Sequence, residues 1–340
     1  MGLLNIFYAR TPKIKIENGT IKNNSIASLD YPEIGGINQF LMIRGHDINN
    51  PILLFLHGGP GNVEGPFAYK FERELEKHFI VVNWDQRGAG KSFSKKIPKA
   101  SMTIEQFVLD TLEVIEYLIT RFDKNKVFIV GHSWGSLLGV LIAFRYPELI
   151  HAFVSVGQIV NILENEKLSY EFTIEYARKM GNEKALKQLK KLNPYPEKAI
   201  NNIKIIKKQR KWLTKFGGVI YNETGWWSYI KIALGSPEYS LKDLIKYIRG
   251  VRFSRKTIWP QLFEIDLPKQ VPELKVPVYF CMGRHDYNTP FELAKKYFNQ
   301  LKAPKKEFIW FENSAHMLNF EEYEKFNDFL INKVLIETQL

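Results

Sequence analysis

The chain has 340 residues, of which 45% are hydrophobic and 14% aromatic, a composition that excludes a disordered polypeptide and allows a large core. A single cysteine, Cys281, excludes an internal disulfide and is typical of a reducing compartment, so we expect a cytoplasmic protein. No run of 18 apolar residues occurs, which predicts no membrane-spanning helix. The net charge of +12 is unevenly placed, because residues 161–260 contain 21 Lys and Arg against 9 Asp and Glu while the rest is neutral.

The first part of the chain predicts strands of two kinds. Residues 13–50 alternate polar and apolar side chains in short pieces such as 13–17 and 39–43, which is typical of antiparallel edge strands with one solvated face. Residues 52–56 and 79–84 are instead continuous apolar runs, as expected for strands that helices cover on both faces.

Strands and helices then alternate. Thr103 begins a predicted helix, with Gln106 at the capping-box position. Further strands are predicted at residues 127–130, 152–156, 276–281 and 307–311, and a last helix from about Glu321. This order indicates an α/β fold with a mostly parallel central sheet and helices on both faces.

One block interrupts the alternation. Residues 161–265 contain helical stretches and no convincing strand, and they are rich in Lys, Trp and Tyr. We therefore predict an α/β core formed by residues 1–160 and 266–340. Residues 161–265 form a helical cap, inserted after the sixth strand and standing over the carboxyl ends of the strands.

The segment Gly131-His-Ser-Trp-Gly135 joins a predicted strand to a predicted helix. Glycines two residues before and after Ser133 allow a turn sharp enough to force the serine into a strained backbone conformation. Such a turn exposes the serine hydroxyl above the sheet, at a helix N-terminus that favours negative charge. Ser133 is therefore a candidate nucleophile.

A serine hydroxyl needs a base to take its proton, and the base needs a third group to orient it. Asp286 follows the strand ending at Cys281, and His316 follows the strand ending at Phe311. Catalytic groups in open α/β sheets lie at these carboxyl ends, so Asp286 and His316 are the candidate acid and base. His285 is the rival base, but it precedes and adjoins the acid, which favours a structural role.

The glycine loop His57-Gly-Gly-Pro-Gly61 follows the strand at residues 52–56 and can direct backbone N–H groups at a developing oxyanion. Pro60 has no N–H, so Gly59 is the better donor, paired with Trp134 just after the nucleophile. The plain alternative is a turn between a strand and a helix. We expect His132 to pack beneath the nucleophile turn and Cys281 to be a small core residue.

Together these segments and Trp84-Asp-Gln-Arg-Gly-Ala-Gly-Lys-Ser92 resemble the proline iminopeptidase family of α/β-hydrolases. The resemblance covers residues 50–160 and 270–340. It implies an α/β-hydrolase fold and a serine aminopeptidase that releases an N-terminal residue, often proline. It also implies that Ser133, His316 and Asp286 are nucleophile, base and orienting acid, and that Gly59 and Trp134 are the oxyanion donors. Asp85 and Arg87 match a family loop that braces the active-site entrance.

Two features depart from the family pattern. His132 stands where family members commonly have glycine. The family's cap also presents acidic residues, typically a Trp-Glu pair, that hold the substrate's free amine, whereas this chain has no Trp-Glu dipeptide and a cationic cap. Among the few cap carboxylates, Glu171 and Glu175 suit a helix surface. Glu223, beside Trp226 and Trp227, is the candidate amine anchor in a substrate pocket, although surface exposure is its alternative.

Three functions remain open. The first is an aminopeptidase acting on a small peptide. The second is a carboxylesterase or amidase that uses the same triad on small acyl substrates. The third is a non-enzymatic hydrolase-like scaffold whose basic cap binds an anionic membrane or partner. An epoxide hydrolase or dehalogenase is disfavoured, because those enzymes have Asp where Ser133 stands.

The motifs also limit the partners. No P-loop and no metal-ligand spacing occur, so no cofactor and no metal are predicted. Charge alone, without a motif, does not predict nucleic-acid binding. Two interpretations of the basic cap stay open: a solvated helical surface, or peripheral contact with an anionic membrane, to which the apolar residues at 3–7 would add a little insertion. No pattern specifies an oligomeric state.

Overall fold

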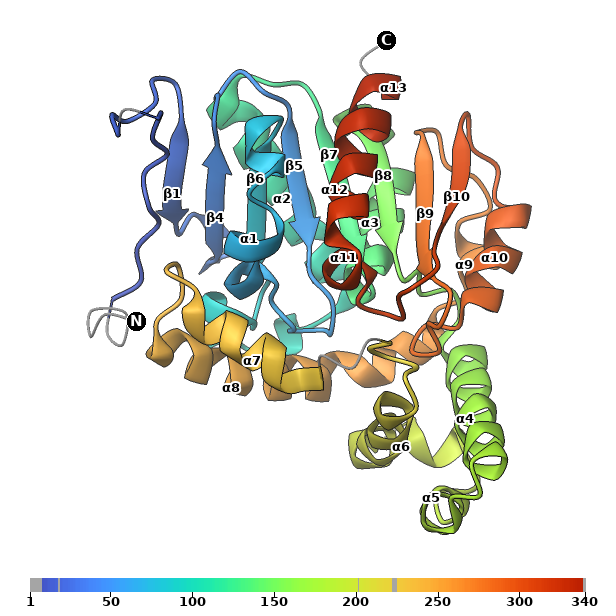
Figure 1. Cartoon of the computed structure of the whole chain (residues 1–340). Coiled ribbons are helices and arrows are strands. Elements are labelled where there is room, and N and C mark those ends of the chain that lie inside the picture. The colour runs from blue at the N-terminus through green and yellow to red at the C-terminus, as the bar shows by residue number, and fades with distance from the viewer. Residues whose placement is uncertain (1–7, 18, 201, 222–224, 339–340) are drawn as a thin grey trace.

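The computed structural model describes residues 8–17, 19–200, 202–221 and 225–338. An eight-stranded sheet in the order β1-β4-β6-β5-β7-β8-β9-β10 runs through its centre (Figure 1). From β6 to β10 all neighbours are parallel, whereas β1 and β4 are antiparallel to their neighbours. The strands are β1 (Ile26–Asp30), β4 (Phe40–Gly45), β5 (Ile52–Leu56), β6 (Ile80–Asp85), β7 (Val127–His132), β8 (Ile150–Val156), β9 (Val278–Gly283) and β10 (Lys306–Phe311), and β2 (Glu33–Ile34) and β3 (Ile37–Asn38) form a separate small hairpin.

The antiparallel edge differs from its prediction in two respects. Residues 13–17 form no strand beyond an isolated bridge between Lys15 and Ile21, and β1 is the edge strand instead. Every residue of β4 is buried, so the expected solvated face is wrong. The reason is that Phe40 packs with Tyr239, from the loop between two cap helices, while Leu41 on the other face joins the main core.

Helices cover both faces of the sheet, as predicted. α2 (Ile104–Phe122), α3 (Trp134–Arg145) and α10 (Phe291–Gln300) pack on one face, where alternate residues such as Leu54 meet them. α1 (Gly65–Phe71) and the C-terminal helices lie on the other (Figure 1), where Phe55 and Phe329 belong to one cluster. Thr103 caps α2 by accepting from the backbone N–H of Gln106, which is one half of the predicted capping box; the Gln106 side chain donates to Asp110 Oδ1 at 2.8 Å. The C-terminal helices are α11 (Leu318–Glu321), α12 (Tyr323–Phe329) and α13 (Ile336–Thr338), joined by a π-helical turn at Leu330–Leu335.

The cap helices lie between β8, the sixth strand of the main sheet, and β9, at the carboxyl ends of the parallel strands (Figure 1). Asn161 and Asp266 pair in an antiparallel bridge where the chain leaves and re-enters the core. Three helices enclose a separate apolar cluster that includes Trp212, and two more lie across the strand ends. The cap helices are α4 (Ile162–Lys179), α5 (Glu183–Lys190), α6 (Ile203–Lys215), α7 (Gly225–Gly235) and α8 (Leu241–Ile258), and the short α9 (Leu267–Gln270) follows.

None of the helices in the described ranges is both long enough and apolar enough to cross a bilayer. The apolar residues 3–7, to which the sequence assigns a small membrane contribution, lie outside the described residues.

Candidate active site

Ser133 occupies the sharp turn between β7 and α3. Its backbone has φ of 53° and ψ of −114°, a conformation that non-glycine residues seldom adopt. A Cβ atom on Gly131 would lie 2.4 Å from the carbonyl oxygen of Gly135, and one on Gly135 would lie 1.8 Å from that of Leu56. Only glycine therefore fits two residues before and two residues after Ser133, and the close packing around these glycines keeps the serine in its strained turn.

Asp286 and His316 come from the loops that follow β9 and β10, which are neighbours in the sheet. Nδ1 of His316 lies 2.8 Å from Oδ2 of Asp286. The backbone N–H groups of Asn288 and Thr289 each donate to Asp286 Oδ1 at 2.9 Å, and the Thr289 hydroxyl donates to Oδ2 at 2.8 Å. The carboxylate is thus held from both sides. It fixes the His316 ring so that Nε2 remains available for proton transfer.

Ser133 and His316 line the same cavity, which has a volume of about 260 Å³. Within the described chain no hydrogen bond joins the Ser133 hydroxyl to the His316 ring; such catalytic bonds often tighten only when substrate binds. Burial lowers the pKa of His316 below its usual value, against the opposing effect of Asp286. The ring is therefore neutral near pH 7, the state that accepts a proton.

The glycine loop after β5 borders the same cavity through Gly58 and Gly59. The Gly58 N–H is already engaged, because it donates to Glu64 Oε1 at 3.2 Å. The N–H groups of Gly59 and Trp134 donate to no acceptor within the described residues. These are the two groups that the sequence predicts as oxyanion donors; Gly59 lines the cavity, whereas Trp134 is buried and is not among the lining residues.

Gln86 supports this loop from the end of β6. Its backbone N–H donates to His57 Nε2 and its side-chain amide donates to the His57 carbonyl, both at 3.2 Å. Its side-chain oxygen accepts from Trp134 Nε1 at 2.8 Å. One side chain therefore links the glycine loop to the first turn of α3, and the sequence prediction for this motif passed over it.

The two residues next to Gln86 in the sequence, Asp85 and Arg87, contact the cap and α2 and not the glycine loop. Asp85 accepts from the hydroxyl of Tyr239, in the cap, at 2.7 Å, and burial raises the pKa of Asp85 to about 7. Arg87 forms a two-pronged ion pair with Asp110 of α2 at 2.7 and 2.9 Å. Asp85 therefore joins the core to the cap, whereas Arg87 secures the loop to α2 and lines no part of the cavity.

His132 and Glu64 form a buried pair directly behind His316. His132 Nδ1 lies 2.7 Å from Glu64 Oε1, and His132 Nε2 lies 3.0 Å from the carbonyl oxygen of His316. Burial alone would lower the pKa of His132, but Glu64, the His316 carbonyl and Asp286 together outweigh it and the pKa is raised. His132 therefore supports the base loop as well as the turn. Its position in the sequence beside Ser133, a candidate nucleophile, was the available signal for a buried acidic partner.

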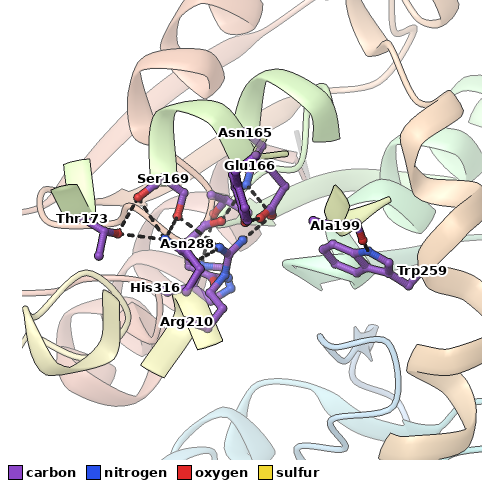
Figure 2. A network of polar contacts seen from close by, with 12 residues as sticks. Asn165, Glu166, Ser169, Thr173, Ala199, Arg210, Trp259, Asn288 and His316 are labelled. Atoms are coloured by element: carbon purple, nitrogen blue, oxygen red, sulfur yellow. Dashed lines mark hydrogen bonds and ion pairs between the residues drawn. The ribbon is translucent and has the colours of Figure 1, made fainter. Parts of the chain in front are cut away.

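A second polar network joins the cap to the acid loop (Figure 2). Arg210 of α6 pairs with Glu166 of α4, and its Nε donates to Asn288 Oδ1 at 2.8 Å. The side chain of Asn165 donates to the Asn288 carbonyl at 2.9 Å. Glu166 also accepts from the hydroxyl of Tyr195. Glu166, Arg210 and Asn288 all line the cavity, and no sequence motif indicated them.

Of the predicted substrate residues, the structure describes the side chain of Trp227 alone. Glu223 lies outside the described residues, and Trp226 is described only as part of the α7 backbone. Trp227 is 75% exposed and is not among the lining residues. Glu171 and Glu175 are exposed on α4, as their spacing indicated.

His285 and Cys281, the other residues considered in the sequence, pack against neighbouring side chains outside the cavity lining. His285 lies outside the cavity lining and stacks on Tyr221, with ring centroids 3.6 Å apart. Cys281 is fully buried in the core cluster of β9, where burial raises the pKa of its thiol. In the described ranges no group of three or more His, Cys, Asp or Glu side chains is arranged to hold a metal ion.

Comparison with known proteins agrees with this architecture. The family model described as "alpha/beta hydrolase fold" matches residues 51–323. The chain is 36% identical to the probable aminopeptidase YbaC of Bacillus subtilis (strain 168), over 88% of this chain and 94% of that protein. It is 24% identical to the proline iminopeptidase of Heyndrickxia coagulans, over 86% of this chain and 93% of that protein.

Solved structures show the same fold at lower identity. A proline iminopeptidase-related protein of Thermus thermophilus superposes with a TM-score of 0.60 at 19% identity, covering 92% of this chain and 98% of that one. An esterase from Exiguobacterium antarcticum has a TM-score of 0.60 at 18% identity, covering 91% and 100%. The predicted fold and family resemblance are confirmed: the chain belongs to the α/β-hydrolase family, in its proline iminopeptidase-like branch.

Proposed function

We propose that this α/β-hydrolase is a serine aminopeptidase that removes the N-terminal residue from small peptides. The observation that carries the proposal is the His316–Asp286 pair, 2.8 Å apart, on the cavity that Ser133 also lines. The relative whose name is probable aminopeptidase, which aligns with 88% of the chain, supports the peptide substrate.

In this mechanism Ser133 Oγ attacks the carbonyl carbon of the first peptide bond, and its proton passes to His316 Nε2. Asp286 orients the ring and stabilises the imidazolium that forms. The N–H groups of Gly59 and Trp134 bind the oxyanion of the tetrahedral intermediate. The intermediate then collapses, His316 gives its proton to the leaving amine, and the acyl group remains on Ser133. A water molecule, deprotonated by His316, hydrolyses the acyl-enzyme and restores the serine.

A carboxylesterase or amidase is the second candidate, and the charges of the cavity favour it. Its two carboxylates, Glu64 and Glu166, already pair with His132 and Arg210. A substrate ammonium therefore finds no unpaired carboxylate among the described lining residues. An acyl substrate without that charge avoids the desolvation cost.

The two candidates are separated by comparing rates on prolyl-, alanyl- and leucyl-arylamides with the rate on a p-nitrophenyl ester. An aminopeptidase hydrolyses free-amine arylamides and loses activity when the amine is acetylated. An esterase hydrolyses the ester and discriminates little between free and acetylated amines. A fluorophosphonate probe that labels Ser133 supports both, and absence of labelling in folded protein argues for the non-enzymatic scaffold.

A further inference from the structure

We propose that Arg255 binds a carboxylate of the substrate, so that the enzyme prefers short peptides with a free C-terminal carboxylate. This inference rests on the proposed function, because it names the substrate class of the same cavity. It begins from the charges that line the cavity: Glu64, Glu166, Lys207, Arg210 and Arg255.

Among the described residues that line the cavity, Arg255 is the cation that is partly buried without an ion pair. Arg210 is neutralised by Glu166, and Lys207 is exposed to solvent. Arg255 is half-buried and forms no ion pair within the described residues. Its hydrogen-bond partner is the neutral side-chain oxygen of Asn62, at 3.2 Å. A guanidinium in this setting keeps donors for a planar, bidentate acceptor such as a carboxylate.

The position of Arg255 places this charge next to the catalytic loop. Asn62 follows the glycine loop directly, and a Cβ on Gly61 would lie 3.0 Å from the Cβ of Ser254. α8 therefore packs closely on the loop that presents Gly59. A small substrate bound at Ser133 lies within one cavity with the Arg255 side chain.

The electrostatics agree with a ligand anion. Burial lowers the pKa of Arg255, and the nearby Arg210 lowers it further, while Tyr247 opposes both. Holding an unpaired cation away from water is costly, and a carboxylate brought by the substrate offsets that cost. Every unblocked short peptide carries such a carboxylate, whereas esters and arylamides lack it.

The test compares a dipeptide, Ala-Ala, with its C-terminal carboxamide, which differs in charge and hardly in shape. The wild-type enzyme should have a kcat/KM at least about tenfold higher for the free acid, the scale of a hydrogen bond to a charged group. Arg255→Gln should remove this ratio and Arg255→Lys should restore part of it. Arg252→Gln, an exposed position on the same helix with the same charge change, should keep the wild-type ratio.

The outcomes separate this inference from the proposed function. Equal rates on acid and carboxamide, with Ser133-dependent hydrolysis intact, overturn the carboxylate site and leave the triad standing. If the chain hydrolyses neither dipeptide, calorimetry on Ser133→Ala protein measures their binding instead. The carboxylate site is supported if Ser133→Ala protein binds the free acid more tightly than the carboxamide and the Ser133→Ala/Arg255→Gln protein does not. Equal binding of acid and carboxamide to Ser133→Ala protein overturns the site. The wild-type comparison needs no variant, so misfolding of Arg255→Gln does not affect it.

A separate observation concerns the outer surface of the cap. α7 and α8 lie side by side across the strand ends (Figure 1). Their exposed apolar residues recur at helical spacing: Trp227, Ile230 and Leu234 on α7, and Leu241, Ile245 and Ile248 on α8. The other exposed residues described on these helices are all cationic, namely Lys231, Lys242, Arg249, Arg252 and Lys256. We call these eleven residues the α7–α8 face.

We infer that the α7–α8 face docks on an anionic lipid surface. Exposed large apolar side chains next to Lys and Arg, with a Trp among them, are the composition of helices that lie in a membrane interface. The positive charge of the face matches acidic headgroups and would repel a second copy of itself. Five of the 21 Lys and Arg side chains in residues 161–260 thus lie on this one surface.

Co-sedimentation with phosphatidylcholine vesicles, with and without phosphatidylserine, tests this docking at low salt, because salt screens the attraction of the face to the headgroups. Binding should require phosphatidylserine, weaken steeply as salt rises, and fall at least about fivefold in Ile245→Ser/Ile248→Ser. Leu109→Ser, an exposed apolar position on α2, is the matched control and should bind as wild type. Absence of binding at low salt, equal binding to neutral vesicles, or concentration-dependent self-association through Ile245 overturns the inference.

Discussion

The imidazole rings of His132 and His316 lie 4.9 Å apart between centroids, and His132 Nε2 contacts the His316 carbonyl oxygen at 3.0 Å. His132 thus lies behind the proposed base and joins it to Glu64. The two rings respond to burial differently, because Glu64 raises the pKa of His132 while that of His316 is lowered. One histidine of the pair is therefore suited to carry charge and the other to remain neutral.

Ser133→Ala should abolish nearly all hydrolysis while leaving the thermal unfolding transition in place. His316→Ala and Asp286→Asn should each lower kcat by several orders of magnitude, and the double variant should be no worse than the worse single one, because the three groups act as a unit. Steady-state kinetics on the best arylamide or ester measures this. Substantial activity left in Ser133→Ala would contradict the proposed nucleophile.

The lowered pKa of His316 predicts the acid limb of the pH profile. A protonated ring cannot accept the serine proton, so kcat/KM should fall as pH decreases through the His316 pKa. The midpoint should lie below about 6.5, the ordinary value for histidine. A pH–rate profile on an uncharged ester isolates this group, since the substrate does not titrate. A midpoint at or above about 6.5 would contradict the direction of the shift.

His132→Asn should make stability depend on pH differently from the wild type. The folded-state pKa of His132 is raised, so its protonation contributes stability that is fully present below the unfolded pKa of about 6.5. That contribution is lost as pH rises through the folded pKa. The difference in unfolding free energy between wild type and His132→Asn should thus be larger at about pH 5.5 than at about pH 8.5. Urea denaturation at both pH values measures it, and a constant difference would show that His132 stays neutral.

Gly135→Ala should destabilise the fold by more than about 3 kcal/mol, because its Cβ would lie 1.8 Å from the carbonyl oxygen of Leu56. Gly181→Ala is the matched control. Gly181 has φ of 59° but open space around it, so only backbone strain of about 1 kcal/mol is expected. Equal losses in the two variants would mean that the strand and helix separate easily at the turn.

Glu223→Gln tests the amine anchor that the sequence indicates. If this carboxylate holds the substrate ammonium, the variant should lose about 1.5–3 kcal/mol of transition-state binding. The loss should appear with free-amine arylamides and vanish with N-acetylated ones. Glu175→Gln, at an exposed cap position, is the control. Equal effects on both substrate types, or none, would remove Glu223 from this role and leave the serine hydrolase intact.

Local pattern was sufficient for the core of the fold. The parallel strands from β5 to β9 are continuous apolar runs for most of their length, and the spacing of Gly131 and Gly135 around Ser133 reflects a steric need within a few residues. The pairing of Asp286 with His316 could be expected because each follows a predicted strand directly, and the two strands are neighbours in the sheet. Sequence patterns predict the structure well where the contacts that determine it lie within a few residues of one another.

Contacts distant in sequence were missed. The burial of β4 depends on Tyr239, about 200 residues further along the chain. Glu64 and His132 are 68 residues apart, and Glu166 and Arg210 are 44 apart, without any shared motif. Trp227 is apolar and close to a predicted pocket residue, yet the helix turns it to solvent. Such pairings depend on how the cap helices pack on the core and on one another, which the spacing of apolar residues within one helix or strand does not specify.

Asn288 has two attachments with a common consequence for substrate entry. Its backbone N–H holds Asp286, while its side chain and carbonyl bind Arg210 and Asn165 of the cap. A cap that swings away from the core must release Asn288 or drag the acid loop with it. The alignment of His316, the proposed base, with Asp286 is therefore linked through Asn288 to the contact between cap and core, and a displaced cap would leave the proposed triad misaligned.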